Sequence, residues 1–129
     1  MTAEAQVPYS CDHCTGPATV GQAIHDGRLH WDLQHLCADG TSGVVQACGR
    51  DDTPGPYRQA LLDQNGTYRL NLAPGTNRIA AMRVLRAHGI PLTDLTGTVR
   101  TGPTGTETEM RLLALHLAEA DVATSLIRL

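Results

Sequence analysis

NRIAAMRVLR, residues 77–86, is the stretch that decides the fold of the second half of this chain. At helical spacing its side chains fall on two faces. One face is aliphatic and suits a protein core, and we expect it to contain Ala80, Ala81, Val84 and Leu85, with His88 just beyond. The other face combines two apolar side chains with three guanidinium groups: Arg78, Ile79, Met82, Arg83 and Arg86. Since an ordinary amphipathic helix presents polar residues to water, the second face predicts a binding surface.

The sequence marks both ends of this helix. The side chain of Asn77 can cap its first turn, and Gly89 followed by Pro91 predicts its end. Thr106 and Glu109 have the form of a capping box that opens a second long helix. We expect a strand at 68–72, the first helix, a short helix at 92–99, a loop with a brief strand at 101–105, the second long helix from 107 to about 120 and a strand at 122–129. This order, β-α-α-(β)-α-β, predicts an α+β sandwich with helices on one side of a sheet.

Residues 67–129 resemble the C-terminal domain of the bacterial ribosomal stalk protein. The hallmark of that family is a strand, then Asn-Lys-(apolar)-Ala-x-Ile-Lys-x-(apolar)-Arg, Gly-Leu-x-Leu, a Leu/Ala-rich helix and a final strand. Here NRIAAMRVLR stands at 77–86 and GIPL at 89–92. In the family the first helix docks translation factors. The resemblance implies the same fold and a partner-binding face made of Arg78, Ile79, Met82, Arg83 and Arg86.

The chain departs from the family in ways that bear on function. Each hallmark Lys is Arg here, and Thr93 and Thr96 stand where the family has Lys. The family's dimerising N-terminal segment and flexible hinge have no counterpart, so we expect an adaptor built on this scaffold and not a ribosomal stalk protein. A fold relative that recruits substrates for a bacterial protease implies that the scaffold also binds peptides, although fold likeness alone does not fix function.

All four cysteines lie in the first half of the chain: Cys11, Cys14, Cys37 and Cys48. The first two form Cys-x2-Cys, the knuckle that places two thiolates on one zinc ion. Fewer than forty residues with few large apolar side chains rarely fold unaided. We therefore predict a structural Zn²⁺ held by all four cysteines.

A β-hairpin is expected between the knuckle and the remaining cysteines. Asp26-Gly27 separates two segments of alternating apolar and polar residues, which is typical of a two-residue hairpin. A third short strand is expected at 44–47. A hairpin between pairs of zinc ligands resembles a zinc ribbon.

The spacing of the cysteines leaves the fourth zinc ligand open. Ten residues separate Cys37 from Cys48, where a zinc ribbon has a second Cys-x2-Cys. One alternative is a site of three cysteines with His13, His35 or another histidine, and another is free or redox-active thiols. We interpret the strand histidines as facing solvent, namely His25, His30 and His35, and His116 as a surface or boundary residue.

The predicted organisation is a flexible N-terminus at 1–9, a zinc-ribbon-like module at 10–53, a connector helix at 54–66 and the stalk-like domain at 67–129. Residues 1–66 hold three Arg against eight acidic residues, a net charge of −5, and residues 67–129 hold seven Arg against five, a net charge of +2. Since affinity for nucleic acid comes largely from basic residues, we do not expect the acidic half to bind it. No apolar segment is long enough to span a membrane and no signal-peptide pattern is present, so we expect a cytoplasmic protein.

The leading functional hypothesis is a non-enzymatic, zinc-containing adaptor whose Arg/Ile/Met face binds a protein or peptide with an acidic, partly apolar surface. A rival hypothesis is that the acidic first half of the same chain covers that face. A zinc-dependent or accessory enzyme would need an open three-cysteine site with His30 or His35 as base, and no known catalytic motif supports it. A thiol or zinc redox sensor is the remaining alternative. The pattern does not predict an oligomeric state.

Overall fold

The computed structural model describes residues 2–10, 15–36 and 43–129. It divides the chain into two compact units, which we call unit 1 (Met1–Asn65) and unit 2 (Gly66–Leu129) and describe separately. The described residues form an α+β protein with two small antiparallel sheets and four α-helices. No helix within this part of the chain has both the length and the apolar character needed to cross a membrane.

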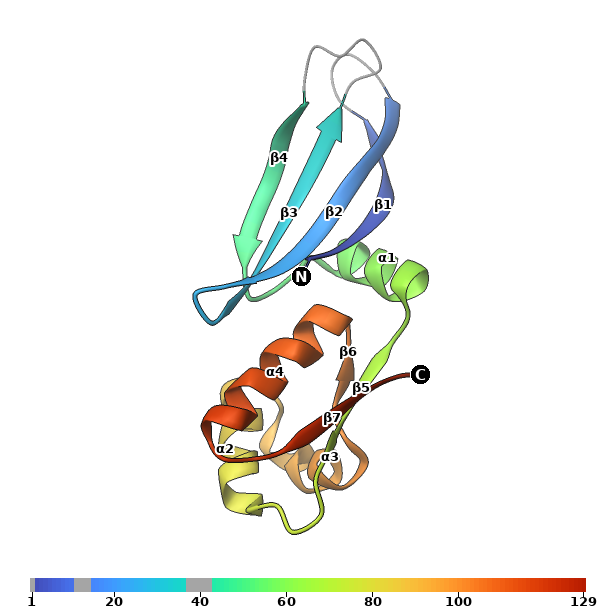
Figure 1. Cartoon of the computed structure of the whole chain (residues 1–129). Coiled ribbons are helices and arrows are strands. Elements are labelled where there is room, and N and C mark those ends of the chain that lie inside the picture. The colour runs from blue at the N-terminus through green and yellow to red at the C-terminus, as the bar shows by residue number, and fades with distance from the viewer. Residues whose placement is uncertain (1, 11–14, 37–42) are drawn as a thin grey trace. The chain divides into compact units, whose positions relative to one another are not determined.

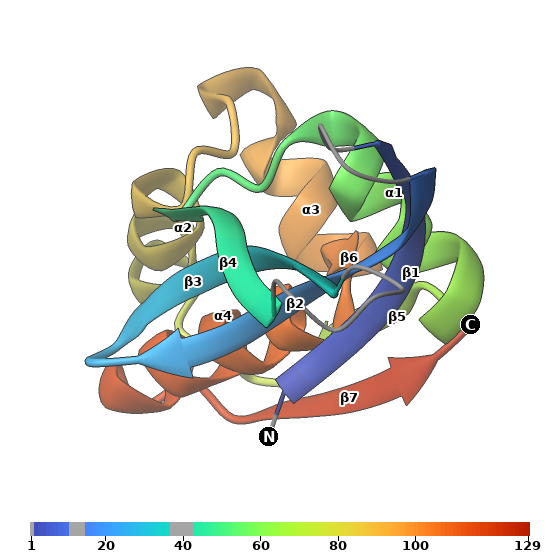
Figure 2. The ribbon, with the colours of Figure 1, turned by 90° about the horizontal axis from the view of Figure 1, so that it is seen from above.

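Unit 1 is a four-stranded sheet followed by one helix. Its elements are β1 (Thr2–Ser10), β2 (Thr15–His25), β3 (Arg28–Leu36), β4 (Gly43–Arg50) and α1 (Gly55–Asn65). The strands lie side by side in chain order and every neighbouring pair is antiparallel (Figures 1 and 2). The turn between β2 and β3 has positive φ at both Asp26 (51°) and Gly27 (71°), as a type I′ hairpin requires. The predicted hairpin is confirmed.

The first strand replaces the flexible N-terminus that we expected at 1–9. β1 pairs with β2 along its whole length, and Ala5 and Val7 are buried against the sheet's core. Small alanines and Pro8 weaken the strand signal in the sequence, but proline is tolerated on an edge strand. The edge of β1 is also bonded by the end of α1, because the amide of Gln64 donates to the carbonyl of Gln6 at 2.7 Å and accepts from its N–H at 2.8 Å. The N-terminal residues are thus part of the fold.

Helix α1 belongs to unit 1, whereas we predicted a connector between two domains. Leu61 is 1% exposed and completes a small core whose other buried members are Ala5, Val7, Ala18, Val20 and Leu33. Pro56 lies in the first turn as predicted. The helix ends before Gly66, whose φ of +95° suits glycine.

Unit 2 has the element order that the sequence predicts. It consists of β5 (Tyr68–Leu72), α2 (Arg78–Ala87), a 3₁₀ turn η1 (Leu92–Asp94), α3 (Leu95–Thr101), β6 (Thr104–Gly105), α4 (Glu107–Glu119) and β7 (Thr124–Arg128). The three strands form an antiparallel sheet in the order β6-β5-β7. The capping box of Thr106 and Glu109 is present at the start of α4.

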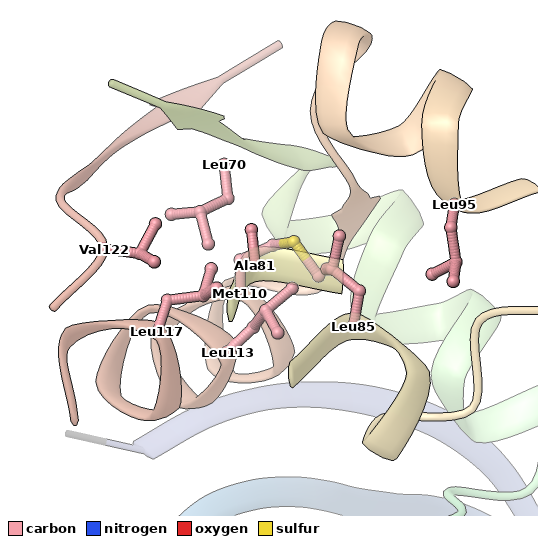
Figure 3. Packing of buried hydrophobic residues seen from close by; sticks show 8 residues of the cluster. All are labelled: Leu70, Ala81, Leu85, Leu95, Met110, Leu113, Leu117 and Val122. Atoms are coloured by element: carbon pink, nitrogen blue, oxygen red, sulfur yellow. The ribbon is translucent and has the colours of Figure 1, made fainter. Parts of the chain in front are cut away.

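The core of unit 2 is rich in leucine. Figure 3 shows its buried side chains gathering between the helices and the sheet: Leu70, Ala81, Leu85, Leu95, Met110, Leu113, Leu117 and Val122. Leu70 comes from the central strand and Leu117 from α4, and neither is accessible to solvent. Gly102, with φ +89°, passes so close to the strand that a Cβ would lie 2.5 Å from the carbonyl oxygen of Leu70. This core fixes the helices that carry the candidate site.

Candidate functional site

Helix α2 is fixed at both ends and along one face. The Oδ1 atom of Asn77 accepts a hydrogen bond from the backbone N–H of Ala80 at 3.2 Å, which is the predicted N-cap. After the C-cap, Gly89 has a φ of +93°, a conformation that favours glycine. Ala81 and Leu85 are fully buried in the core of unit 2. Because the helix cannot rotate without exposing them, the direction of its outer side chains is fixed as well.

The outer face of α2 presents an apolar side chain among arginines. Ile79 is 68% exposed, and Arg78, Arg83 and Arg86 are exposed too. Within residues 66–129, all of which the structure describes, these three guanidinium groups make no ion pair and no hydrogen bond. Their charges are therefore not neutralised inside their own unit.

Met82 does not share this exposure. It is half-buried and packs against the core of unit 2. The angular position that groups Met82 with Ile79 is correct, but its long flexible side chain reaches the core from the edge of the face. Of the two apolar residues predicted to bind a partner, Ile79 alone is exposed.

A further exposed apolar residue follows α2. Leu92, in η1, is 69% exposed. The sequence matched it to the Gly-Leu-x-Leu motif of the stalk family, yet we assigned it no role in binding. An apolar residue that directly follows Pro91 in a short turn has little backbone around it to cover it, and this was the signal that could have identified it. His88, expected on the aliphatic face, is also exposed and caps the C-terminus of α2.

In unit 1, the strand ends that flank three of the cysteines lie at one end of the sheet. Ser10 pairs with Thr15, and Leu36 pairs with Gly43. The predicted zinc ligands Cys11, Cys14 and Cys37 follow or precede these strand ends in the sequence and lie outside the described residues. The fourth predicted ligand, Cys48, is described.

Cys48 lies in the middle of the sheet. Strand β4 is longer than the predicted 44–47, and within it Cys48 pairs with Asp32, four residues before the end of β3. At about 3.3 Å per residue, roughly 13 Å separates this position from the strand end at Leu36. Cys48 is an exposed free thiol and lines a shallow hollow of about 450 Å³ with Glu4, His30, Asp32, Gln34 and Arg50 among others.

His35 is buried, at 2% exposure, whereas we interpreted it as facing solvent. It continues the inward-facing row of Leu29 and Leu33 along β3. Its Nδ1 lies 3.1 Å from the carbonyl oxygen of Pro17, and its ring lies 4.8 Å from that of Tyr9. Since a carbonyl can only accept, Nδ1 carries the proton in this hydrogen bond.

The imidazole of His35 also leans toward the end of the sheet. A Cβ on Gly16, two residues beyond Cys14, would lie 3.8 Å from its Cε1 atom. The other histidines predicted to face solvent do so more nearly, since His25 is exposed and His30 is half-buried.

An ion pair joins the β2–β3 hairpin to the end of β4. The Nη2 atom of Arg28 donates to Oδ2 of Asp51 at 2.5 Å, and the backbone N–H of Asp51 donates to the carbonyl of Leu29 at 2.8 Å. The hydrogen bond from Arg28 holds the pKa of the Asp51 carboxyl below its usual range and raises the pKa of Arg28. Asp51 closes the sheet, with a positive φ of 65°.

Metal-binding geometry and known relatives give no further assignment. Among the residues that the structure describes, no group of three or more His, Cys, Asp or Glu side chains is placed to hold a metal ion. No protein-family model, no curated protein and no solved structure gives a significant match to this chain.

Proposed function

We propose that this protein is a non-enzymatic adaptor that binds an acidic, partly apolar protein or peptide through the outer face of α2. The observation that carries the proposal is Ile79, which is 68% exposed on a helix held rigid by its buried side. An isolated exposed isoleucine is unremarkable. Here three arginines surround it on the same face with no ion-pair partner in their unit, and an apolar anchor with an arginine rim is the composition of many binding sites.

The proposal includes the stalk-like fold for residues 67–129. Its support is the motif at 77–92, together with an observed element order of β5-α2-α3-β6-α4-β7 and a helix that begins and ends at the residues the motif predicts. Leu92 extends the proposed binding residues, because its exposure of 69% resembles that of Ile79. Met82 contributes mainly by supporting the helix.

The test replaces Ile79 by Ser and compares it with Leu115→Ser, a matched control on α4 where the leucine is 43% exposed. Each purified variant is used to capture partners from an extract of the source cells, and each is melted. We expect capture of the specific partner to fall about tenfold or more with Ile79→Ser, the size of a hot-spot truncation. Melting should change little in both variants, because exposed substitutions usually shift stability by less than about 0.5 kcal/mol. Equal capture by both variants would refute the proposal.

Charge gives a second, independent test. Arg83→Glu should weaken partner binding and reduce its dependence on salt, because the arginine rim attracts an acidic surface. Arg100→Glu is the control, since Arg100 is exposed on α3, away from the α2 face in sequence. Binding that responds equally to both reversals would reflect net charge and not the α2 face.

We also propose that unit 1 holds a structural Zn²⁺ through Cys11, Cys14 and Cys37, with a fourth ligand from the described part of the chain. The support is the Cys-x2-Cys knuckle and the small core of the unit, in which Leu33 and Leu61 are the only leucines among the described cluster members. Cys48 was the predicted fourth ligand. Sulfur ligands at about 2.3 Å from zinc lie within about 4 Å of one another, and the mid-sheet position of Cys48 fits such a site poorly.

His35 fits the fourth position better. A zinc-bound histidine usually donates its second N–H to a carbonyl or carboxylate, and the Nδ1 of His35 has such a partner in Pro17. This tautomer directs the lone pair of Nε2 away from the carbonyl. Absorption spectroscopy at the zinc edge distinguishes three sulfurs and one nitrogen from four sulfurs. Cys48→Ser should leave one zinc per chain and an unchanged spectrum, whereas His35→Gln should lose metal; the reverse pattern would restore Cys48 as the ligand.

A further inference from the structure

Two histidines from different helices of unit 2 meet at the C-terminal ends of those helices. His88 is the C-cap of α2, and His116 lies in the last turn of α4. The Nε2 atom of His88 lies 2.6 Å from Nδ1 of His116, and the two ring centroids are 4.8 Å apart. One nitrogen atom of each ring is thus directed at the same point in space.

The positions of both histidines are fixed by the core of unit 2. The backbone N–H of His88 donates to the carbonyls of Val84 and Leu85, both at 3.1 Å. His116 precedes Leu117, which is fully buried. Figure 3 shows Leu85 from α2 and Leu113 and Leu117 from α4 packed in the same cluster. The short distance between the rings therefore follows from helix packing, and neither ring is carried by a loop.

We propose that His88 and His116 form a binding site for a divalent transition-metal ion such as Zn²⁺ or Ni²⁺. Neutral imidazole is a good ligand for these ions. Zinc–nitrogen bonds of about 2.0–2.1 Å in a tetrahedral site place two ligand nitrogens about 3.4 Å apart, so the rings need to separate by less than about 1 Å. His88 is exposed, which leaves water free to fill the remaining coordination positions.

The electrostatic setting also favours a cation at this point. The C-terminal ends of α2 and α4 both carry the negative end of a helix dipole. Glu119 lies three residues after His116 on α4, on the same side of the helix. Because no third ligand is already in place among the described residues, the site has two protein ligands. A bound ion would link the end of α2 to α4.

The test uses Ni²⁺ as a paramagnetic probe on the full-length chain, after loading with one equivalent of Zn²⁺ so that the cysteines are occupied. In amide NMR spectra near pH 7.5, we expect substoichiometric Ni²⁺ to broaden signals of residues 86–89 and 114–118 first. His88→Gln and His116→Gln should each raise the Ni²⁺ concentration needed for half-broadening about tenfold or more. Excess Zn²⁺ should reverse the broadening, and so should acidification below about pH 6, where imidazole is protonated.

His25→Gln is the matched control, because His25 and His30 form another pair with ring centroids 5.3 Å apart but no nitrogen-to-nitrogen contact in the structure. It should leave broadening at α2 and α4 unchanged. Equal broadening of both histidine pairs would mean adventitious ion binding only. No broadening near His88 would mean that the pair is a closed hydrogen bond, and either result overturns the proposal. Neither result bears on partner binding by Ile79, which is measured without Ni²⁺.

Discussion

The two units have almost the same length but are stabilised in different ways. Unit 2 buries five leucines in one cluster, whereas the described cluster of unit 1 contains two leucines and is otherwise alanine and valine. Unit 1 adds polar connections instead: Gln64 bonds the edge of β1, and Arg28 pairs with Asp51. Unit 2 therefore folds as an apolar core that can leave one helix face free for binding. Unit 1 depends on additional contacts and, in our proposal, on a metal ion.

Removing zinc should have the largest effect and should affect one unit only. Structural zinc contributes roughly 10–16 kcal/mol in small domains, so a strong chelator under reducing conditions is expected to unfold unit 1. Amide signals of β3, such as Leu33, should lose dispersion while those of Leu85 and Leu117 stay in place. A metal-free chain with an intact β2–β3 hairpin would show that the core of unit 1 suffices without zinc.

Truncating a core leucine should have a smaller effect, confined to unit 2. Leu117→Ala removes a fully buried side chain and should cost about 2–5 kcal/mol of unfolding free energy. Leu115→Ala, two residues away and 43% exposed, should cost less than about 0.5 kcal/mol. Denaturant titration monitored by signals of unit 2 measures both. A similar cost for the two variants would contradict the packing described here.

The amide of Gln64 should matter less than a core leucine but more than a surface residue. Gln64→Ala removes two hydrogen bonds to the backbone of Gln6, each worth about 0.5–1.5 kcal/mol. Gln59→Ala is the control on the same helix, because the amide of Gln59 bonds to Asp63 within α1. Hydrogen exchange at the N–H of Gln6 should accelerate in the first variant and stay unchanged in the second. Unchanged exchange in both would mean that β1 needs no protection of its edge.

The smallest expected effect is a pH dependence of unit 1. The pKa of Asp51 is lowered in the folded state by its hydrogen bond with Arg28. A lowered carboxyl pKa stabilises the fold above the unfolded value of about 3.9, and this stabilisation is lost as pH falls from there through the folded pKa. The pair is exposed, so the effect is slight. Comparing Asp51→Asn with the natural chain between pH 3 and 6 should show convergence at the acidic end; parallel curves would contradict it.

Much of unit 2 could be predicted because its signals are local. Asn77 and Gly89 mark the ends of α2, Thr106 and Glu109 mark the start of α4, and alternation marks β5. Each signal acts within a few residues, where hydrogen-bond chemistry decides the outcome. The exposed face of α2 also follows from helical periodicity, since Ala81 and Leu85 turn inward as expected.

Features that depend on distant contacts could not be predicted in the same way. Strand β1 forms because β2 and Gln64 pair with its two edges, across 58 residues in the case of Gln64. His35 becomes buried because the inward row of β3 continues to the strand end beside Tyr9. Met82 shares an angle with Ile79 but reaches the core. His88 and His116 are 28 residues apart and meet only through the packing of α2 against α4.

The central claim, that the outer face of α2 is free to bind a partner, is tested most directly by the methyl signal of Ile79. The chain has four isoleucines, Ile24, Ile79, Ile90 and Ile127, so a spectrum of labelled isoleucine methyl groups is simple to assign. With a soluble paramagnetic agent added to the full chain, the Ile79 methyl should broaden more than that of half-buried Ile90. Addition of the captured partner should then protect Ile79 and leave Ile127 unchanged. An Ile79 methyl that is already protected in the free protein would contradict the account, because the chain itself would then cover the face.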